Sequence, residues 1–142
     1  MADRRFGATV RNFARLTKAD LRYVAAESIQ DVLEGAQTPQ LGMTKGAPGF
    51  EEGKIPVAEA DLINSLAVDG GGSGRMSYTT AIAGFELGDV LTFRWTAPHA
   101  LAMELGWTTE AGTEVPGRFF VTRNAERFSD HVARHVRTVS AR

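Results

Sequence analysis

Three histidines are the side chains with the clearest potential for chemistry. His131 and His135 lie four residues apart in a segment predicted to be helical, so both rings would share one face and could hold a metal ion. The segment lacks the glutamate of the zinc-protease motif, and no third ligand lies nearby in the sequence. His99 and Glu104 could form an acid–base pair, but no nucleophile is marked near them. We therefore expect no metal, no cofactor and no enzymatic activity.

Glycine-rich residues 70–74 are the obvious candidate for a phosphate-binding loop. A Walker loop requires a Gly-Lys-Ser/Thr ending between a strand and a helix, whereas here no lysine follows and strand-like runs flank the glycines. Arg75 also occupies the position where a nucleophile elbow requires glycine. The run instead predicts a mobile hairpin tip.

Charged side chains form two stripes. An acidic stripe lies on a predicted helix over residues 18–36, and a basic stripe lies on the predicted last helix. The stripes consist of Asp20, Glu27, Asp31 and Glu34, and of Arg123, Arg127, Arg134 and Arg137. The arginines could contact nucleic-acid phosphates or an acidic face in the same or a neighbouring subunit. We favour the acidic face, because the chain is not basic overall and carries no signature of a DNA-binding module.

The composition is that of one globular domain. The chain has 142 residues and a mass of 15.3 kDa. It has no cysteine, which excludes disulfides, cysteine-ligated zinc and thiol nucleophiles. No run of 18 apolar residues predicts a membrane span, and the start of the chain has no secretion signal, so we expect it in a cytoplasm. The net charge is −1, with basic ends and an acidic middle.

Apolar spacing and turn residues predict the elements that position these side chains. Thr17 is the expected N-cap of the helix over 18–36, and residues 8–16 suggest a short helical turn before it. Runs 62–68, 75–83 and 89–96 are expected to form an antiparallel meander, because they are rich in apolar, β-branched and aromatic residues. Helices are expected over 97–107 and 118–138, the last with Ala125, Phe128, Val132, Val136 and Val139 on its apolar side.

The resulting fold prediction is a single α+β domain over residues 1–142. An antiparallel sheet of three to four strands is packed by N- and C-terminal amphipathic helices. Mobile loops are expected near 37–55, 70–74 and 108–117, which are rich in glycine, proline and polar residues.

Three short segments carry a resemblance to a known family. Pro56-Val57 leads to Leu62-x-x-Ser65-Leu66, which starts the predicted strands. Ala100-x-x-Met103-Glu104-x-Gly106 and Pro116-Gly117-Arg118-Phe119-Phe120 precede the last helix. In this order and spacing, over roughly residues 10–138, the chain resembles the tail-completion or head–tail joining (neck) proteins of long-tailed bacteriophages and phage-like particles. Glu59-Ala60 and Trp107 depart from the Thr-Gly and Thr of the family's motifs.

The resemblance implies a structural virion protein without an active site. It would form a ring, most simply a hexamer, at the head–tail junction or the top of the tail, assembled in the host cytoplasm. Its neighbours would be head-closure, tail-terminator or tail-tube proteins, and DNA would pass through the ring without sequence-specific binding. Two alternatives remain, a tail-terminator protein and a small nucleic-acid-binding protein that uses the arginine stripe; a hydrolase ranks third.

If the protein forms a ring, the two stripes and the motif residues are candidates for the subunit interface. The expected interface residues are Asp20, Glu27, Asp31, Glu34, Glu104, Phe119, Phe120, Arg123, Arg127, Arg134 and Arg137. Of the two adjacent phenylalanines, we expect Phe120 in the core and Phe119 as the anchor of a loop or a neighbouring subunit, since neighbouring helical side chains point about 100° apart.

Overall fold

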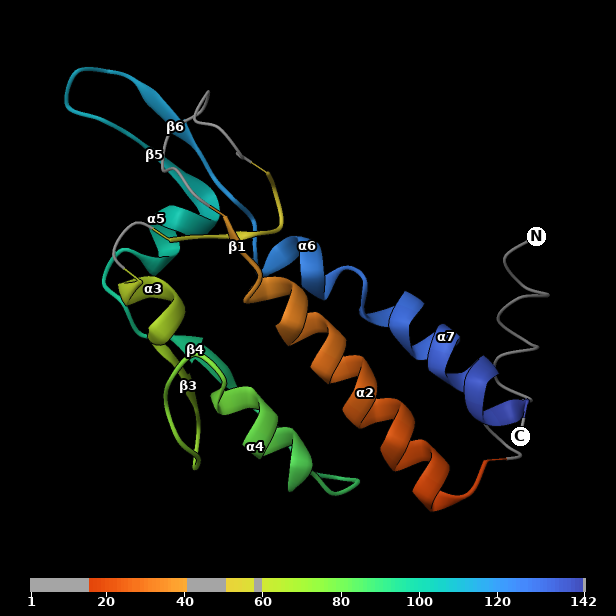
Figure 1. The fold of residues 1–142 in the computed structure, drawn as a ribbon. Helices are drawn as coiled ribbons and strands as arrows, with labels where there is room; N and C mark the ends of the chain where they lie inside the picture. The colour runs from red at the N-terminus through yellow and green to blue at the C-terminus, as the bar shows by residue number, and fades with distance from the viewer. Residues whose placement is uncertain (1–15, 41–50, 58–59, 142) are drawn as a thin grey trace, which may run out of the picture.

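The computed structural model describes residues 16–40, 51–57 and 60–141. Helices and short strands are mixed along this part of the chain, and the fold is α+β (Figure 1). The helices are α2 (Lys18–Ala36), α3 (Asp61–Asn64), α4 (Ser77–Ala83), α5 (Ala100–Leu105), α6 (Thr122–Ala125) and α7 (Phe128–Ser140). The strands are β1 (Pro39–Gln40), β2 (Ile55–Pro56), β3 (Leu66–Val68), β4 (Phe93–Trp95), β5 (Gly106–Thr108) and β6 (Glu114–Pro116).

Helix α2 runs through the middle of the molecule and organises the other elements (Figure 1). Its predicted start is confirmed: the Thr17 hydroxyl accepts a bond from the Asp20 backbone N–H at 3.1 Å, and the Asp20 carboxylate accepts one from the Thr17 N–H at 3.2 Å. At its end, the buried Gln37 amide donates to the carbonyls of Ile63 and Arg75 and accepts from the Trp95 indole. One side chain thus ties α2 to three later segments.

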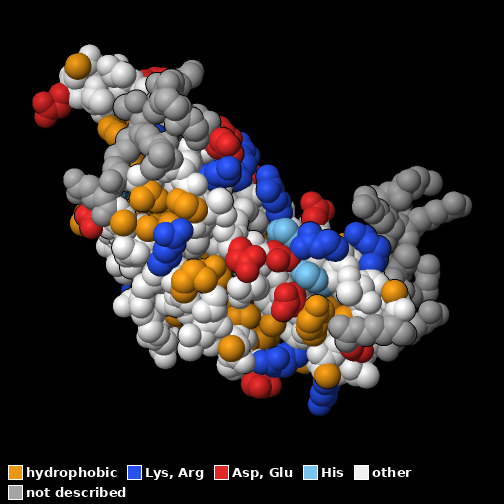
Figure 2. Space-filling view, in the orientation of Figure 1, with side chains coloured by type: hydrophobic (Ala, Val, Ile, Leu, Met, Phe, Trp, Pro, Cys, Tyr) orange, Lys and Arg blue, Asp and Glu red, His pale blue; other side chains and the backbone are white. Residues whose placement is uncertain are grey.

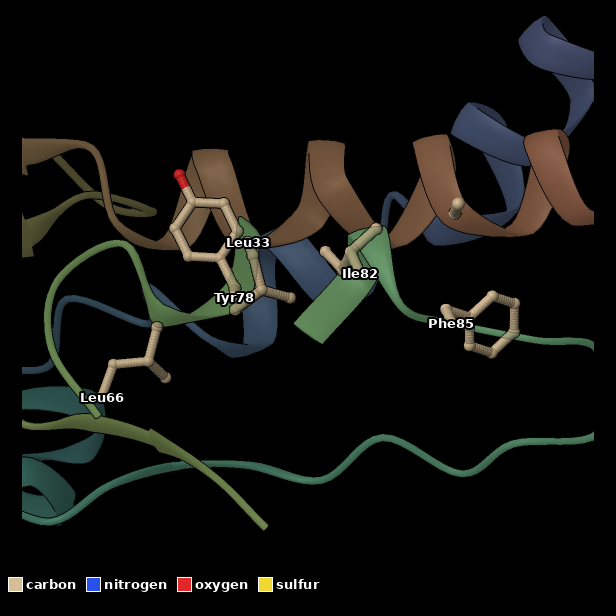
Figure 3. Packing of buried hydrophobic residues seen from close by; sticks show 6 residues of the cluster. Leu33, Leu66, Tyr78, Ile82 and Phe85 are labelled. Carbon is tan, nitrogen blue, oxygen red and sulfur yellow. The ribbon is translucent and has the colours of Figure 1, made fainter. Parts of the chain in front are cut away.

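Residues 75–83, predicted as a strand, form helix α4 instead. Tyr78 and Ile82 lie four residues apart, which puts both on one helical face against Leu33 of α2 (Figure 3). Leu66 and Phe85 complete this core cluster. The strand prediction was wrong because Tyr78 and Ile82 have helical spacing, and their burial against α2 outweighs the strand propensity of the run.

The predicted sheet of three to four strands is replaced, among the described residues, by three separate two-stranded sheets. Strands β3 and β4 pair antiparallel, with Leu66 opposite Trp95, because α4 occupies the position expected for a middle strand. Strands β1 and β2 pair parallel, and β5 and β6 pair antiparallel. The core cluster is formed by side chains of α2 and α4 together with Leu66 of β3 and Phe85, in place of the larger sheet that was predicted.

Two of the predicted loops contain strands. Residues 37–55 include β1 and the start of β2, while residues 41–50 lie outside the described part. Residues 108–117 form the turn and second strand of the β5–β6 hairpin, which projects from the body (Figure 1). Residues 70–74 form a turn after β3, but the chain continues into helix α4 and not into the second strand of the predicted hairpin. The mobility of these segments stays a prediction, and the helical turn predicted over 8–16 lies outside the described residues apart from Leu16.

The predicted last helix is two helices, α6 and α7, and the predicted helix over 97–107 is shortened to α5. Helix α7 lies alongside α2 (Figure 1), where Val136 and Val139 pack with Val24 in a small core cluster. The prediction of the apolar side was wrong for two residues, because Ala125 and Phe128 are exposed. The break before Phe128 changes the helical phase that the prediction assumed. No described helix is long and apolar enough to cross a membrane.

Candidate functional site

Some of the predicted interface residues gather at two places. One is the contact between α2 and α7, where the acidic and basic stripes meet. Figure 2 shows this face of the molecule, with acidic, basic and histidine side chains interspersed. The other place is the joint between α5 and α6, formed by two of the motif segments.

Asp31 of α2 is the centre of the α2–α7 contact. Its carboxylate accepts from the Arg134 guanidinium at 2.6 Å and from the His135 Nε2 at 2.6 Å. Its side chain is 22% exposed and that of His135 is 13% exposed, whereas that of Arg134 is 51% exposed. The His135 bond is therefore the better shielded of the two, and the acidic and basic stripes are joined within one subunit.

His131 completes this cluster as a neutral acceptor. The Arg134 Nη2 lies 3.0 Å from the His131 Nδ1, and a guanidinium only donates, so this nitrogen carries no proton. Partial burial lowers the pKa of His131, with Asp31 opposing and Arg134 adding to the effect. At neutral pH the cluster thus contains one carboxylate, one guanidinium and a neutral His131.

The cluster does not form a metal site. Two histidines and a carboxylate are suitable ligands for zinc, but the Arg134 guanidinium binds the same Asp31 oxygen as His135 and would repel a cation. In the part of the chain that the structure describes, no group of three or more potential ligands is arranged to hold a metal. The arrangement is chemically a helix–helix clasp.

Glu104 stabilises the start of α6. Its Oε1 accepts from the Val121 N–H at 3.0 Å, and its Oε2 accepts from the N–H and the hydroxyl of Thr122 at 2.8 and 2.6 Å. A carboxylate is favourable here because the first N–H groups of a helix have no acceptor within the helix. Glu104 therefore acts inside the subunit as a capping group that links α5 to α6.

Two glycines let the same segments approach closely. The backbone N–H groups of Arg118 and Phe119 donate to the carbonyls of Met103 and Glu104. A Cβ at Gly106 would lie 2.5 Å from the Val115 carbonyl oxygen, and a Cβ at Gly117 would overlap the Glu104 backbone. The two motif segments thus form one structural unit in which these positions require glycine.

The two phenylalanines divide as predicted with respect to burial. Phe120 is 1% exposed and packs edge-on against Trp95, with ring centroids 5.4 Å apart. Phe119 is partly exposed, its φ of +50° is unusual for a bulky residue, and the Arg123 guanidinium lies 5.6 Å from its ring centroid. Whether Phe119 also anchors a neighbouring subunit stays a prediction.

Two buried polar residues in this joint escaped the sequence analysis. Arg118 is fully buried, its Nη1 donates to the Pro116 carbonyl, and burial lowers its pKa. Asn124 is buried, and its amide donates to the carbonyls of Gly53 and Phe120. The burial of Arg118 and Asn124 was not predicted, because Arg and Asn usually lie at the surface. The apolar motif around Arg118 was the only feature of the sequence that pointed to burial.

The remaining predicted residues lie on the surface or serve local roles. Arg123 pairs with Glu52 and Glu126, Glu34 accepts from Gln30, and Asp20 belongs to the α2 capping box. Glu27 is partly buried on α2. Arg127 and Arg137 are exposed, and neither has an ion pair to a described residue.

Comparison with models of protein families, with curated proteins and with solved structures finds no match for this chain.

Proposed function

We propose that the protein is a structural component of a phage or phage-like particle. It forms a ring, most simply of six copies, at the head–tail junction or the top of the tail, and DNA passes through the ring. Its ring neighbours are head-closure, tail-terminator or tail-tube proteins. The protein is not an enzyme, and its residues serve assembly.

The proposal rests on the family resemblance, and one observation supports it most. Two of the three resembling segments, which are separated in the sequence, form one joint through Glu104, Gly106, Gly117 and Phe120. The β5–β6 hairpin connects the two segments and brings them into contact, so the spacing between them has a structural basis. The residues that carry the resemblance therefore have a common structural purpose, which is to fix the direction in which the C-terminal helices leave the β5–β6 hairpin.

Nucleic-acid binding through the arginine stripe receives less support. Arg123 and Arg134 bind carboxylates of the same chain, at 3.1 and 2.6 Å. A phosphate would have to displace these carboxylates, so mainly Arg127 and Arg137 are left for contact with DNA. Salt-dependent binding of duplex DNA by the purified chain would favour this alternative over the ring.

Deletion of the gene in cells that produce the particles tests the proposed function. Electron microscopy should then show full heads and separate tails, and a plasmid copy should restore complete particles. A tail-terminator would instead give tails of uncontrolled length, which distinguishes that alternative. Complete, infectious particles without the protein would overturn the proposal.

A further inference from the structure

We infer that Phe128 at the start of α7 in one copy inserts into the pocket at the β5–β6 hairpin of a second copy. This contact would join neighbouring subunits of the proposed ring, so the inference rests on the proposed function and specifies the partner surface. The partner is another copy of this chain.

The receiving surface is an open pocket with a partly apolar wall. It has a volume of about 450 Å³ and is lined by Leu105, Gly106, Trp107, Thr108, Glu114, Val115 and Pro116. The lining residue Leu105 is 57% exposed, and Leu101, one helical turn before it on α5, is 69% exposed. Exposed leucines next to an open pocket are typical of the apolar centre of an interface.

The inserting surface is the only part of α7 where a large apolar side chain faces solvent. Phe128 is 42% exposed, whereas Val136 and Val139 of the same helix are buried against α2. Among the described residues, Phe128 belongs to no hydrophobic core cluster. An aromatic ring that enters a pocket is the usual anchor of a protein interface.

The charges around the two surfaces are complementary. Residues 100–116 carry three acidic side chains and no basic one. Glu104 caps α6, but Glu110 and Glu114 are exposed on the hairpin and have no ion pair with a described residue. Arg127, which precedes Phe128, is likewise exposed and has no ion pair within the described chain. The acidic hairpin around the pocket would therefore meet Arg127 beside the aromatic ring. Of the acidic side chains near Phe128, Glu126 is paired with Arg123, and Asp130 is exposed.

The complementarity favours a second copy over an unrelated partner. Each chain carries one inserting surface and one receiving surface, and the two differ. A contact between different surfaces of identical chains is heterologous, so every copy can both insert and receive, and the chain of contacts can close into a ring.

Sedimentation equilibrium of the purified chain measures this contact. Phe128→Ala should weaken self-association about 30-fold, as expected for an aromatic anchor. Val90→Ala is the matched control, because Val90 is also an apolar side chain, 87% exposed, on another part of the surface. Equal association constants of the Phe128→Ala and Val90→Ala variants would overturn the inference, and would be the result if another segment of the same chain filled the pocket.

Charge-reversal variants test the ionic contact between Arg127 and Glu114 separately from the insertion of Phe128. Arg127→Glu should weaken self-association, and mixing it with the Glu114→Arg variant should restore a mixed assembly. If the mixture associates no better than either variant alone, the proposed pairing of Arg127 with Glu114 is wrong.

Cross-linking tests the geometry directly, because the chain has no cysteine of its own. A mixture of Ser129→Cys and Thr113→Cys chains should form a mixed disulfide dimer under oxidation at high protein concentration. A mixture of Ser129→Cys with Ser73→Cys is the control, since Ser73 lies in the turn after β3. A lack of preference for the first mixture would overturn the inference.

The failures of the two proposals are distinguishable. If particles contain a ring of this protein that is unaffected by Phe128→Ala, the contact is wrong and the function stands. If the pure chain associates through Phe128 but no particle contains it, the function is wrong and the contact stands.

Discussion

Glu104 and Phe120 act on the same joint by different physical means. Glu104 supplies acceptors to backbone N–H groups of α6, while Phe120 fills the core beside Trp95. Neither role requires a second subunit, although both residues were predicted at an interface. At the scale of residues, the joint gives both side chains a structural role within the subunit.

Truncation of Phe120 should cost much of the protein's stability. Phe120→Ala removes a ring that is 1% exposed and leaves a cavity, so we expect a loss of about 3–5 kcal/mol in the free energy of unfolding. Phe119→Ala is the adjacent control and should cost at most about 1 kcal/mol, mainly through its contact with Arg123. Urea denaturation measures both values. Equal losses for the two variants would contradict the division of roles.

Removal of the Glu104 carboxylate should weaken the joint by a smaller amount. Glu104→Ala leaves the N–H groups of Val121 and Thr122 without their acceptors, and we expect a loss of about 1–3 kcal/mol. Glu114→Ala removes the same side chain from an exposed strand position and should change stability by less than about 0.5 kcal/mol. Denaturation of both variants gives the comparison. A loss for Glu104→Ala no larger than that of the control would show that the cap is unimportant.

At the scale of elements, α2 and α7 are held by a small apolar cluster and by the Asp31 clasp. Among the described residues, the apolar cluster contains three buried side chains, Val24, Val136 and Val139. The polar contacts of Asp31 with Arg134 and His135 therefore matter for the alignment of the two helices. Of the two possibilities for the stripes, contact in the same or in a neighbouring subunit, the structure shows the first, through Asp31 and Arg134.

The clasp should make stability depend on pH through His131. Burial lowers the pKa of His131 in the folded protein, so its contribution is present above its unfolded pKa of about 6.5 and is lost as the pH falls toward the folded value. Protonation also removes the acceptor that Arg134 uses. Thermal unfolding at pH 7 and pH 5 should therefore show a smaller drop in Tm for His131→Gln than for the natural sequence.

His99→Gln is the matched control for the pH experiment, because His99 precedes α5 and lies outside the α2–α7 contact. Its Tm should fall with pH as steeply as that of the natural sequence. The same pH dependence in the His131→Gln variant and the natural sequence would contradict the assigned role of His131.

Local signals predicted some elements well. Thr17 and Asp20 identify the start of α2, because a capping box depends only on residues close in the sequence. The burial of Phe120 was also predicted and is confirmed. The capping box is local, whereas the burial of Phe120 is completed by distant residues such as Trp95, so only the choice between Phe119 and Phe120 could be made from the sequence.

The features of the fold that were not predicted depend on contacts between residues far apart in the sequence. Helix α4 depends on burial of Tyr78 and Ile82 against α2, which no local window contains. The pairing of Pro39 with Ile55 joins segments that are far apart, and the joint of Gly106 with Gly117 depends on close backbone approach. The clasp on Asp31 joins residues more than 100 positions apart, so the stripes could be seen but not their pairing.

At the scale of the whole molecule, the body and the projecting hairpin present different surfaces to a neighbour. The body exposes Arg127 and Phe128 at the start of α7, and the hairpin exposes Glu110 and Glu114 beside an open pocket. Different surfaces on one small subunit are what closed rings require. The proposed role therefore needs no catalytic residue, only a stable joint that directs these surfaces.

A reconstruction of the native particle by electron cryomicroscopy tests the proposed function most directly. The account predicts a ring of this chain at the head–tail junction or the top of the tail, most simply with six copies, around a channel through which DNA passes. A complete particle whose density at these positions is fully explained by other proteins would contradict the account.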